Sequence, residues 1–221
     1  EHALRMLSEL DALRHADVLE PYTGPAILEP TATGVLFHEV LGHRLEAHRL
    51  DDEDEGRTFA HHLGKAILPA FITILDDPTS LAYGNVPLNG AYRVDDEGVA
   101  SVAVPLVVDG VLRDFLSPRR PAPGFKSSNG HGRAAGLLRP VARMGTLIVR
   151  CSAPVSVASL HRMLVDEIRR QGKPHGFIIR DLVGGATNTS SYGYQAFTAQ
   201  PRLVYRVDAK SGAKTLVRGV D

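Results

Sequence analysis

Hydrophobic residues in this chain recur at helical spacing in some stretches and as short runs in others. Between residues 3 and 14, leucines stand three positions apart among charged residues, which predicts an amphipathic helix that packs into a core. A second helix is predicted to begin after Ser156, a good N-cap residue, and to end near Gly172. A third stretch, residues 35–41, is mostly apolar and predicts a buried helix.

Short apolar runs separated by turn residues predict strands over much of the remaining chain. The turn signal is strongest at Asp109-Gly110, a dipeptide typical of two-residue hairpins, which lies between runs 99–108 and 111–116. Further strands are predicted at 26–28, 71–75, 146–150, 177–183, 194–198, 203–207 and 214–217. We therefore predict an α+β fold with a large, curved, mostly antiparallel sheet and helices packed against it.

The apolar stretch around residue 38 carries the clearest candidate chemistry. His38 and Glu39 are followed by His43, five residues after the first histidine. Five steps of a regular α-helix turn a side chain by about 140°, which is too far for both imidazoles to reach one ion. A single π-type turn would realign them, and Gly42 is where such a distortion costs least. We therefore predict a bulged metal-binding helix.

Two histidines beside a glutamate are the ligand and base types of metalloproteases. On this interpretation His38 and His43 bind the metal, and Glu39 is the catalytic general base. The alternative is a solvated helix face, since such combinations arise by chance. The apolar neighbours favour the metal site, because a buried imidazole needs a partner.

Composition sets limits on the partners of the chain. Its 221 residues and 43% hydrophobic content suit a single domain, residues 1–221, with a core of ordinary size. Lys plus Arg and Asp plus Glu both number 25, and no long basic or apolar run is present, so we expect neither a nucleic-acid nor a membrane partner. The lone Cys151 cannot form an internal disulfide and fits a reducing, cytoplasmic location.

The chain resembles the TldD/PmbA family of metalloproteases, also known as putative modulators of DNA gyrase. The family signature His-Glu-x-x-x-His is matched by His38, Glu39 and His43. Other matches follow in order along the chain: Leu75-Asp76-Asp77-Pro78, Asp95-Asp96-Glu97-Gly98, Asp109-Gly110-Val111-Leu112, Ser128-Asn129-Gly130-His131-Gly132-Arg133 and Pro140-Val141-Ala142-Arg143-Met144. The resemblance extends from Tyr22 to the end of the chain.

The resemblance implies zinc-dependent hydrolysis of unfolded or extended peptides, with Zn²⁺ held by His38, His43 and a cysteine from a C-terminal segment. That segment and the family's N-terminal domain are absent from this sequence, so we expect a fragment or a shortened relative. Cys151, Glu46 and His48 remain alternative third ligands. The loop 117–145 is rich in Pro, Gly, Ser and Arg, and we expect it to line the substrate cleft, with Arg133 and Arg143 as substrate contacts.

The resemblance also implies a dimer, either a homodimer or a heterodimer with a related subunit that lacks the zinc motif. Because both histidines and the glutamate are present, this chain resembles the active subunit. The alternative is a catalytically silent structural or peptide-binding subunit of such a heterodimer, since one zinc ligand is unaccounted for.

Overall fold

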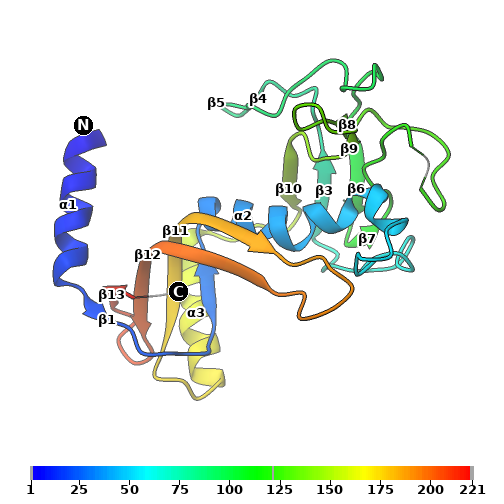
Figure 1. Cartoon of the computed structure of the whole chain (residues 1–221). Coiled ribbons are helices and arrows are strands. Elements are labelled where there is room, and N and C mark those ends of the chain that lie inside the picture. The colour runs from blue at the N-terminus through cyan, green and yellow to red at the C-terminus, as the bar shows by residue number, and fades with distance from the viewer. Residues whose placement is uncertain (1, 121, 220–221) are drawn as a thin grey trace. The chain divides into compact units, whose positions relative to one another are not determined.

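The computed structural model of the chain describes residues 2–120 and 122–219, in which helices and mixed sheets give the predicted α+β class (Figure 1). The chain divides into two compact units. Unit 1 consists of Glu1–Phe37, Val155–Ala186 and Phe197–Asp221, and unit 2 of His38–Pro154 and Thr187–Ala196. The strands form two main sheets, one in each unit, instead of one large sheet. The single domain over residues 1–221 stays a prediction.

Unit 1 is built on a five-stranded mixed sheet in the order β1-β13-β12-β11-β2. The strands are β1 (Asp17–Val18), β2 (Ala26–Leu28), β11 (His175–Thr187), β12 (Phe197–Asp208) and β13 (Lys214–Arg218). The runs 194–198 and 203–207, predicted as two strands, fall mainly within β12, because Pro201 does not interrupt the strand.

Helix α3 (Val157–Arg170) packs on this sheet through one apolar stripe. Its buried residues Leu164, Val165 and Ile168 contact Ile178 of β11 and Val207 of β12. The helix begins as predicted, since Ser156 is the N-cap and its hydroxyl oxygen accepts a hydrogen bond from the Ser159 amide at 3.1 Å.

Helix α1 (His2–His15) forms where the leucine spacing predicts it, but the prediction that its stripe packs into a core is wrong. Leu4, Leu7 and Leu10 are 71%, 61% and 58% exposed. Periodicity indicates which face of a helix is apolar, and it does not specify what that face meets.

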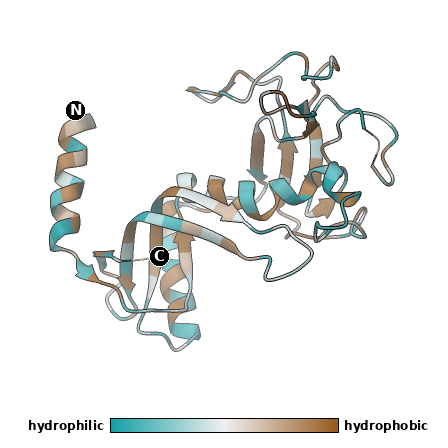
Figure 2. Ribbon diagram, in the orientation of Figure 1, coloured by the Kyte–Doolittle hydropathy of each residue, from teal (hydrophilic) through white to brown (hydrophobic). Residues whose placement is uncertain are grey.

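Unit 2 contains a four-stranded antiparallel sheet in the order β10-β3-β6-β7. Its strands are β3 (Ile72–Asp76), β6 (Val104–Val108), β7 (Val111–Leu112) and β10 (Leu147–Cys151), and they are largely hydrophobic (Figure 2). Two short hairpins lie outside it: β4 (Ala82–Tyr83) with β5 (Val86–Pro87), and β8 (Gly132–Arg133) with β9 (Val141–Ala142).

The segment that carries the histidines is not one continuous helix. Helix α2 (Pro30–Val40) is followed by Leu41, and then by two 3₁₀ helices, η1 (Gly42–Leu45) and η2 (Ala47–Leu50). Glu46 between them is extended, with φ −82° and ψ 107°. The predicted π-type turn is therefore wrong, although the distortion falls at Gly42 as predicted.

Arg44 explains why α2 can end here. The last carbonyls of a helix have no partner within the helix. The Arg44 guanidinium donates to the carbonyl oxygens of Glu39 and Val40 at 3.2 and 2.9 Å, so these groups are satisfied without a continued helix or a widened turn. Gly42 allows a close approach, because a Cβ there would lie 2.0 Å from Sδ of Met144.

No helix within the described residues combines the length and the apolar character that crossing a membrane requires.

The Asp109-Gly110 hairpin yields a stability prediction. Both residues have positive φ, 49° and 76°, as a type I′ turn requires. In Gly110→Ala the left-handed backbone costs about 1–2 kcal/mol. The new Cβ would also lie 2.3 Å from the Leu68 carbonyl oxygen, which adds roughly 1–3 kcal/mol of strain. We expect the free energy of unfolding, measured by urea titration, to fall by the sum.

Gly64→Ala is the matched control. Its φ is 79°, and a Cβ there meets nothing within 4 Å, so only the backbone cost applies. Equal losses in the two variants would contradict the close approach at Gly110.

Candidate metal centre

His38, Glu39 and His43 converge at the break between α2 and η1. Each offers one ligand atom, and these atoms lie within 4.8 Å of one another. The two imidazole rings meet edge to face, with centroids 4.7 Å apart and an interplanar angle of 83°. Among the described residues these three make up the group that could hold a metal ion. The helix break thus achieves the convergence that a regular helix of this spacing forbids.

The glutamate lies between the two imidazoles. One carboxylate oxygen of Glu39 is 3.9 Å from Nε2 of His38, and the other is 3.8 Å from Nε2 of His43. The Glu39 side chain is only 12% exposed, whereas that of His38 is 49% exposed. The expectation that apolar neighbours bury His38 is therefore wrong, because about half of its side chain remains exposed.

Electrostatics favour the metal-binding form of His38. Desolvation of the half-buried imidazole lowers the pKa of His38 below its ordinary value, and the charge of the neighbouring His43 lowers it further. The carboxylates of Glu39, Glu46 and Asp76 oppose this shift. Because metals bind the neutral imidazole, a lowered pKa keeps the ligand available at neutral pH.

Glu46 supports His43 from the other side. Its side chain is fully buried, and one oxygen lies 3.0 Å from Nδ1 of His43. The other oxygen accepts from Nε of Arg49 at 3.0 Å and from Arg143 at 2.9 Å. Burial alone would raise the pKa of Glu46, but the hydrogen bond with His43 and the charges of both arginines outweigh it, so the pKa lies below its usual value.

The residues present fit a zinc ion in their chemistry. Imidazole nitrogens and a carboxylate are among its usual ligands, and a metal-bound histidine commonly has its second nitrogen held by a carboxylate, as His43 is by Glu46. The alternative third ligands do not join the group. Both oxygens of Glu46 already have partners, and neither His48 nor the exposed Cys151 belongs to the cluster.

The two arginines predicted to contact substrate lie in different settings. Arg143 forms the ion pair with Glu46. Arg133 pairs with Asp96 at 3.1 Å and lies over the ring of Tyr92, 4.3 Å from its centroid. Their role in substrate binding stays a prediction.

Sequence reasoning missed a buried pair that holds the 117–145 region in place. His131 and Asp76 are both fully buried, and Nε2 of His131 lies 3.1 Å from the Asp76 carboxylate. The same oxygen of Asp76 accepts from the amides of Gly145 and Thr146 at 2.9 and 3.1 Å. His131 and Asp76 are 55 positions apart in the sequence, so no local sequence pattern indicates their contact. The three-residue spacing of His43, Glu46 and Arg49 predicts contacts only on a continuous helix, and Glu46 is extended here, so it gave no valid signal for the Glu46 contacts either.

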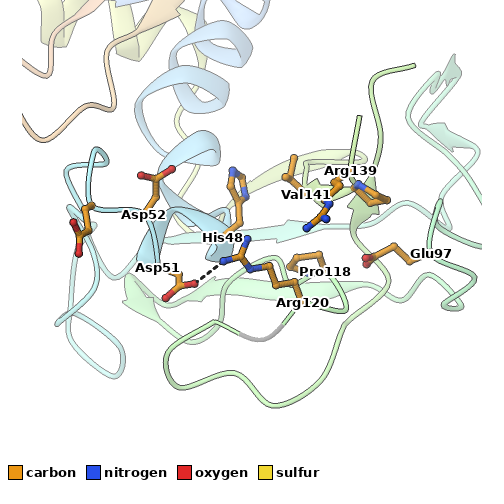
Figure 3. A pocket seen from close by; sticks show the side chains of 10 residues that line it. His48, Asp51, Asp52, Glu97, Pro118, Arg120, Arg139 and Val141 are labelled. Carbon is orange, nitrogen blue, oxygen red and sulfur yellow. Dashed lines mark hydrogen bonds and ion pairs between the residues drawn. The ribbon is translucent and has the colours of Figure 1, made fainter. Parts of the chain in front are cut away.

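A pocket in unit 2, about 560 Å³ in volume, has charged walls (Figure 3). It is lined by His48, Asp51, Asp52, Glu53, Glu97, Pro118, Arg120, Arg139, Pro140 and Val141. Arg120 pairs with Asp51 at 3.2 Å. The imidazole of His48 has a buried Nδ1 without a hydrogen-bond partner, and burial is the main cause that lowers its pKa to about 4.

Comparison with known proteins shows extensive similarity to one family. The family model described as PmbA/TldA metallopeptidase C-terminal domain matches residues 21–207. A metalloprotease of Archaeoglobus fulgidus is 30% identical over 203 residues, which are 90% of this chain and 43% of that protein. A metalloprotease of Methanocaldococcus jannaschii is 32% identical over 125 residues, 56% of this chain and 26% of that protein.

A third relative, a zinc metalloprotease TldD homolog of Saccharolobus solfataricus, is 30% identical over 95 residues, 43% of this chain and 20% of that protein. The chain thus spans less than half the length of these curated relatives.

Solved structures share the fold at lower identity. TldE from Thermococcus kodakarensis matches with a TM-score of 0.66 and 18% identity, over 96% of this chain and 44% of that one. A proposed modulator of a DNA gyrase from Thermotoga maritima matches with a TM-score of 0.68 and 19% identity, over the same 96% and 44%. The neighbours support the α+β fold described above.

The pKa of His48 yields a prediction about pH. The folded protein takes up this proton near pH 4, whereas the unfolded chain takes it up near 6.5. Between these values the unfolded state binds more protons at this site, so the contribution of His48 to stability falls as the pH drops from 6.5 toward 4. The effect is at most about 3 kcal/mol, and solvent screening reduces it because the side chain is only partly buried.

We expect His48→Gln to reduce this pH dependence, as measured by urea unfolding of the metal-free chain from pH 4 to above 6.5. Identical slopes for the variant and the wild type over this range would contradict the assignment.

Proposed function

Because this chain belongs to the PmbA/TldD family of metallopeptidases, we propose that unit 2 carries the metal site of a zinc-dependent peptidase. The observation that supports this most strongly is the convergence of the His38, Glu39 and His43 ligand atoms within 4.8 Å. The name of the zinc metalloprotease relative supports the choice of metal.

In the proposed site His38 and His43 hold the zinc, and Glu39 stays free for proton transfer. The ion would polarise the scissile carbonyl and lower the pKa of a water molecule to about 7. The Glu39 carboxylate, 3.8–3.9 Å from both imidazoles, lies where it can accept a proton from the attacking water.

Glu39 moves one proton from the attacking water to the leaving amine. As the water oxygen bonds to the carbonyl carbon, Glu39 takes one of its protons. When the carbon–nitrogen bond breaks, Glu39 returns that proton to the amine nitrogen, which leaves as a neutral amine. The Glu39 side chain is only 12% exposed, which limits the access of bulk water to the carboxyl group while it carries the proton.

We propose unfolded or extended peptides as the substrates, and an edge of the sheet in unit 2 supports this. Strand β10 is the first strand of the order β10-β3-β6-β7 and pairs with β3. On its other side β10 has no partner strand among the described residues. An extended peptide can add to such an edge through main-chain hydrogen bonds, largely independent of its side chains.

We further propose that the protein acts in the cytoplasm, as a homodimer or as a heterodimer with a related subunit. The likeness of the fold to TldE supports a partner of the same fold. The single cysteine supports a reducing compartment.

The second candidate function is a catalytically silent structural or peptide-binding subunit of such a heterodimer. The observation in its favour is that the cluster offers only two imidazoles besides the proposed base. Zinc binding and catalysis separate the two candidates.

We expect the purified chain to bind about one zinc ion. His38→Ala and His43→Ala should each abolish stoichiometric binding, because only one of the two proposed imidazole ligands remains. Metal content after dialysis, measured by atomic emission, checks this. His61→Ala, which removes a histidine outside the cluster, is the control. Zinc retention in both cluster variants would contradict the proposed ligands.

We expect Glu39→Gln to keep zinc binding and to lower kcat for cleavage of an unfolded peptide by about 10²–10⁴-fold, because the amide cannot accept the proton. Peptide cleavage followed by mass spectrometry measures the loss. Glu20→Gln, an exposed position in unit 1, should leave the rate unchanged. Undiminished cleavage by Glu39→Gln would remove it as the base, and a zinc-loaded wild type without cleavage would favour the silent subunit.

A further inference from the structure

Glu46 is a fully buried carboxylate that touches a proposed metal ligand without joining the ligand group. We propose that Glu46 is the positioning residue of the metal centre, which fixes the tautomer and orientation of His43 so that the Nε2 lone pair faces the site. The inference rests on the proposed function, because His43 is proposed there as a zinc ligand. The tautomer and orientation of His43 can nevertheless be tested in the metal-free chain.

The tautomer follows from what a carboxylate can do. An ionised carboxylate only accepts hydrogen bonds, so the hydrogen between Glu46 and His43 must be on Nδ1 of the imidazole. A neutral imidazole has one hydrogen, which leaves the lone pair on Nε2. That nitrogen is 3.8 Å from the Glu39 carboxylate, on the side where His38 also lies.

The carboxylate of Glu46 cannot turn away, because two guanidinium groups hold its second oxygen. Arg49 approaches it at 2.9–3.0 Å through two nitrogens, and Arg143 at 2.9 Å through one. Arg49 is itself fixed by contacts with Glu55 and the Thr189 hydroxyl. Charge balance also favours the ionised form, since both guanidinium groups are positive.

Arg143 comes from a segment that is anchored independently. Its amide donates to the carbonyl oxygen of His131 at 3.0 Å, and His131 is the partner of Asp76 in the buried pair. The next residue, Met144, lies against Gly42 at the helix break. The segment therefore braces both Glu46 and the backbone next to His43.

A glutamine at position 46 would reverse the arrangement. The two guanidinium groups need an acceptor, so the amide oxygen would face Arg49 and Arg143, and the NH₂ group would face Nδ1 of His43. That nitrogen would then have to accept, which moves the imidazole hydrogen to Nε2 and removes the lone pair that a metal needs.

The first test measures the metal-free wild-type chain. Long-range ¹H–¹⁵N NMR distinguishes the two neutral tautomers of a histidine, and a His43→Gln variant assigns the signals. We expect the hydrogen of His43 on Nδ1. A hydrogen on Nε2 would overturn the proposal, whether or not the chain binds zinc.

The second test compares Glu46→Gln with Glu167→Gln. Glu167 also pairs with an arginine, Arg170, but it lies in α3 of unit 1, outside the Glu46 network, so it is a control for loss of a carboxylate–guanidinium pair. We expect Glu46→Gln to shift the His43 hydrogen to Nε2 and to weaken Zn²⁺ binding, measured by competition with a chromophoric chelator, by about 10- to 100-fold. Glu167→Gln should keep both properties.

Two further outcomes complete the test. A folded Glu46→Gln chain, judged by circular dichroism, with wild-type Zn²⁺ affinity would overturn the positioning role. If this variant does not fold, the wild-type tautomer alone decides. A wild type with the Nδ1 hydrogen but no zinc binding would instead contradict the proposed function and leave the orientation by Glu46 standing.

Discussion

The candidate site depends on the interruption of one helix. Two imidazoles five residues apart diverge by about 140° on a regular α-helix, so they meet only if the chain leaves that geometry between them. Here α2 ends at Val40, and a 3₁₀ helix starts at Gly42. The Arg44 guanidinium makes this possible by donating hydrogen bonds to the carbonyl groups of Glu39 and Val40, which the helix leaves unsatisfied. A guanidinium four residues past the helix end thus supports the convergence of His38 and His43.

A buried carboxylate, that of Glu46, supports the site from behind His43. Glu46 lies in the interior because three groups compensate the cost of burying its carboxylate: the imidazole of His43 and the guanidinium groups of Arg49 and Arg143. Two of these partners are three residues away along the chain, one in each flanking 3₁₀ helix, and Arg143 comes from 97 residues away. The orientation of a histidine near α2 is therefore linked to the packing of the distant sheet region in unit 2.

The features that the sequence predicts correctly depend on residues close together in the chain, and most of those that it does not predict depend on residues far apart. The family, the α+β class, the Asp109-Gly110 hairpin and the Ser156 cap were predicted correctly, because each is carried by motifs or by contacts within a few residues. The kind of helix distortion at Gly42 was not, because Arg44 satisfied the backbone in a way that spacing does not reveal. The partner of Arg143 and the exposure of α1 depend on tertiary packing, which residue periodicity does not encode.

The division of the chain into two units has a consequence for the design of truncated forms of the protein. The backbone passes between the units four times, at residues 37/38, 154/155, 186/187 and 196/197. No uninterrupted stretch of gene therefore encodes the histidine-bearing half. A clone of residues 38–154 would lose Thr189 and Gln195, which accept hydrogen bonds from Arg49 and Arg44. Isolating that half would require a chimera in which the excised tip 187–196 is spliced back to it.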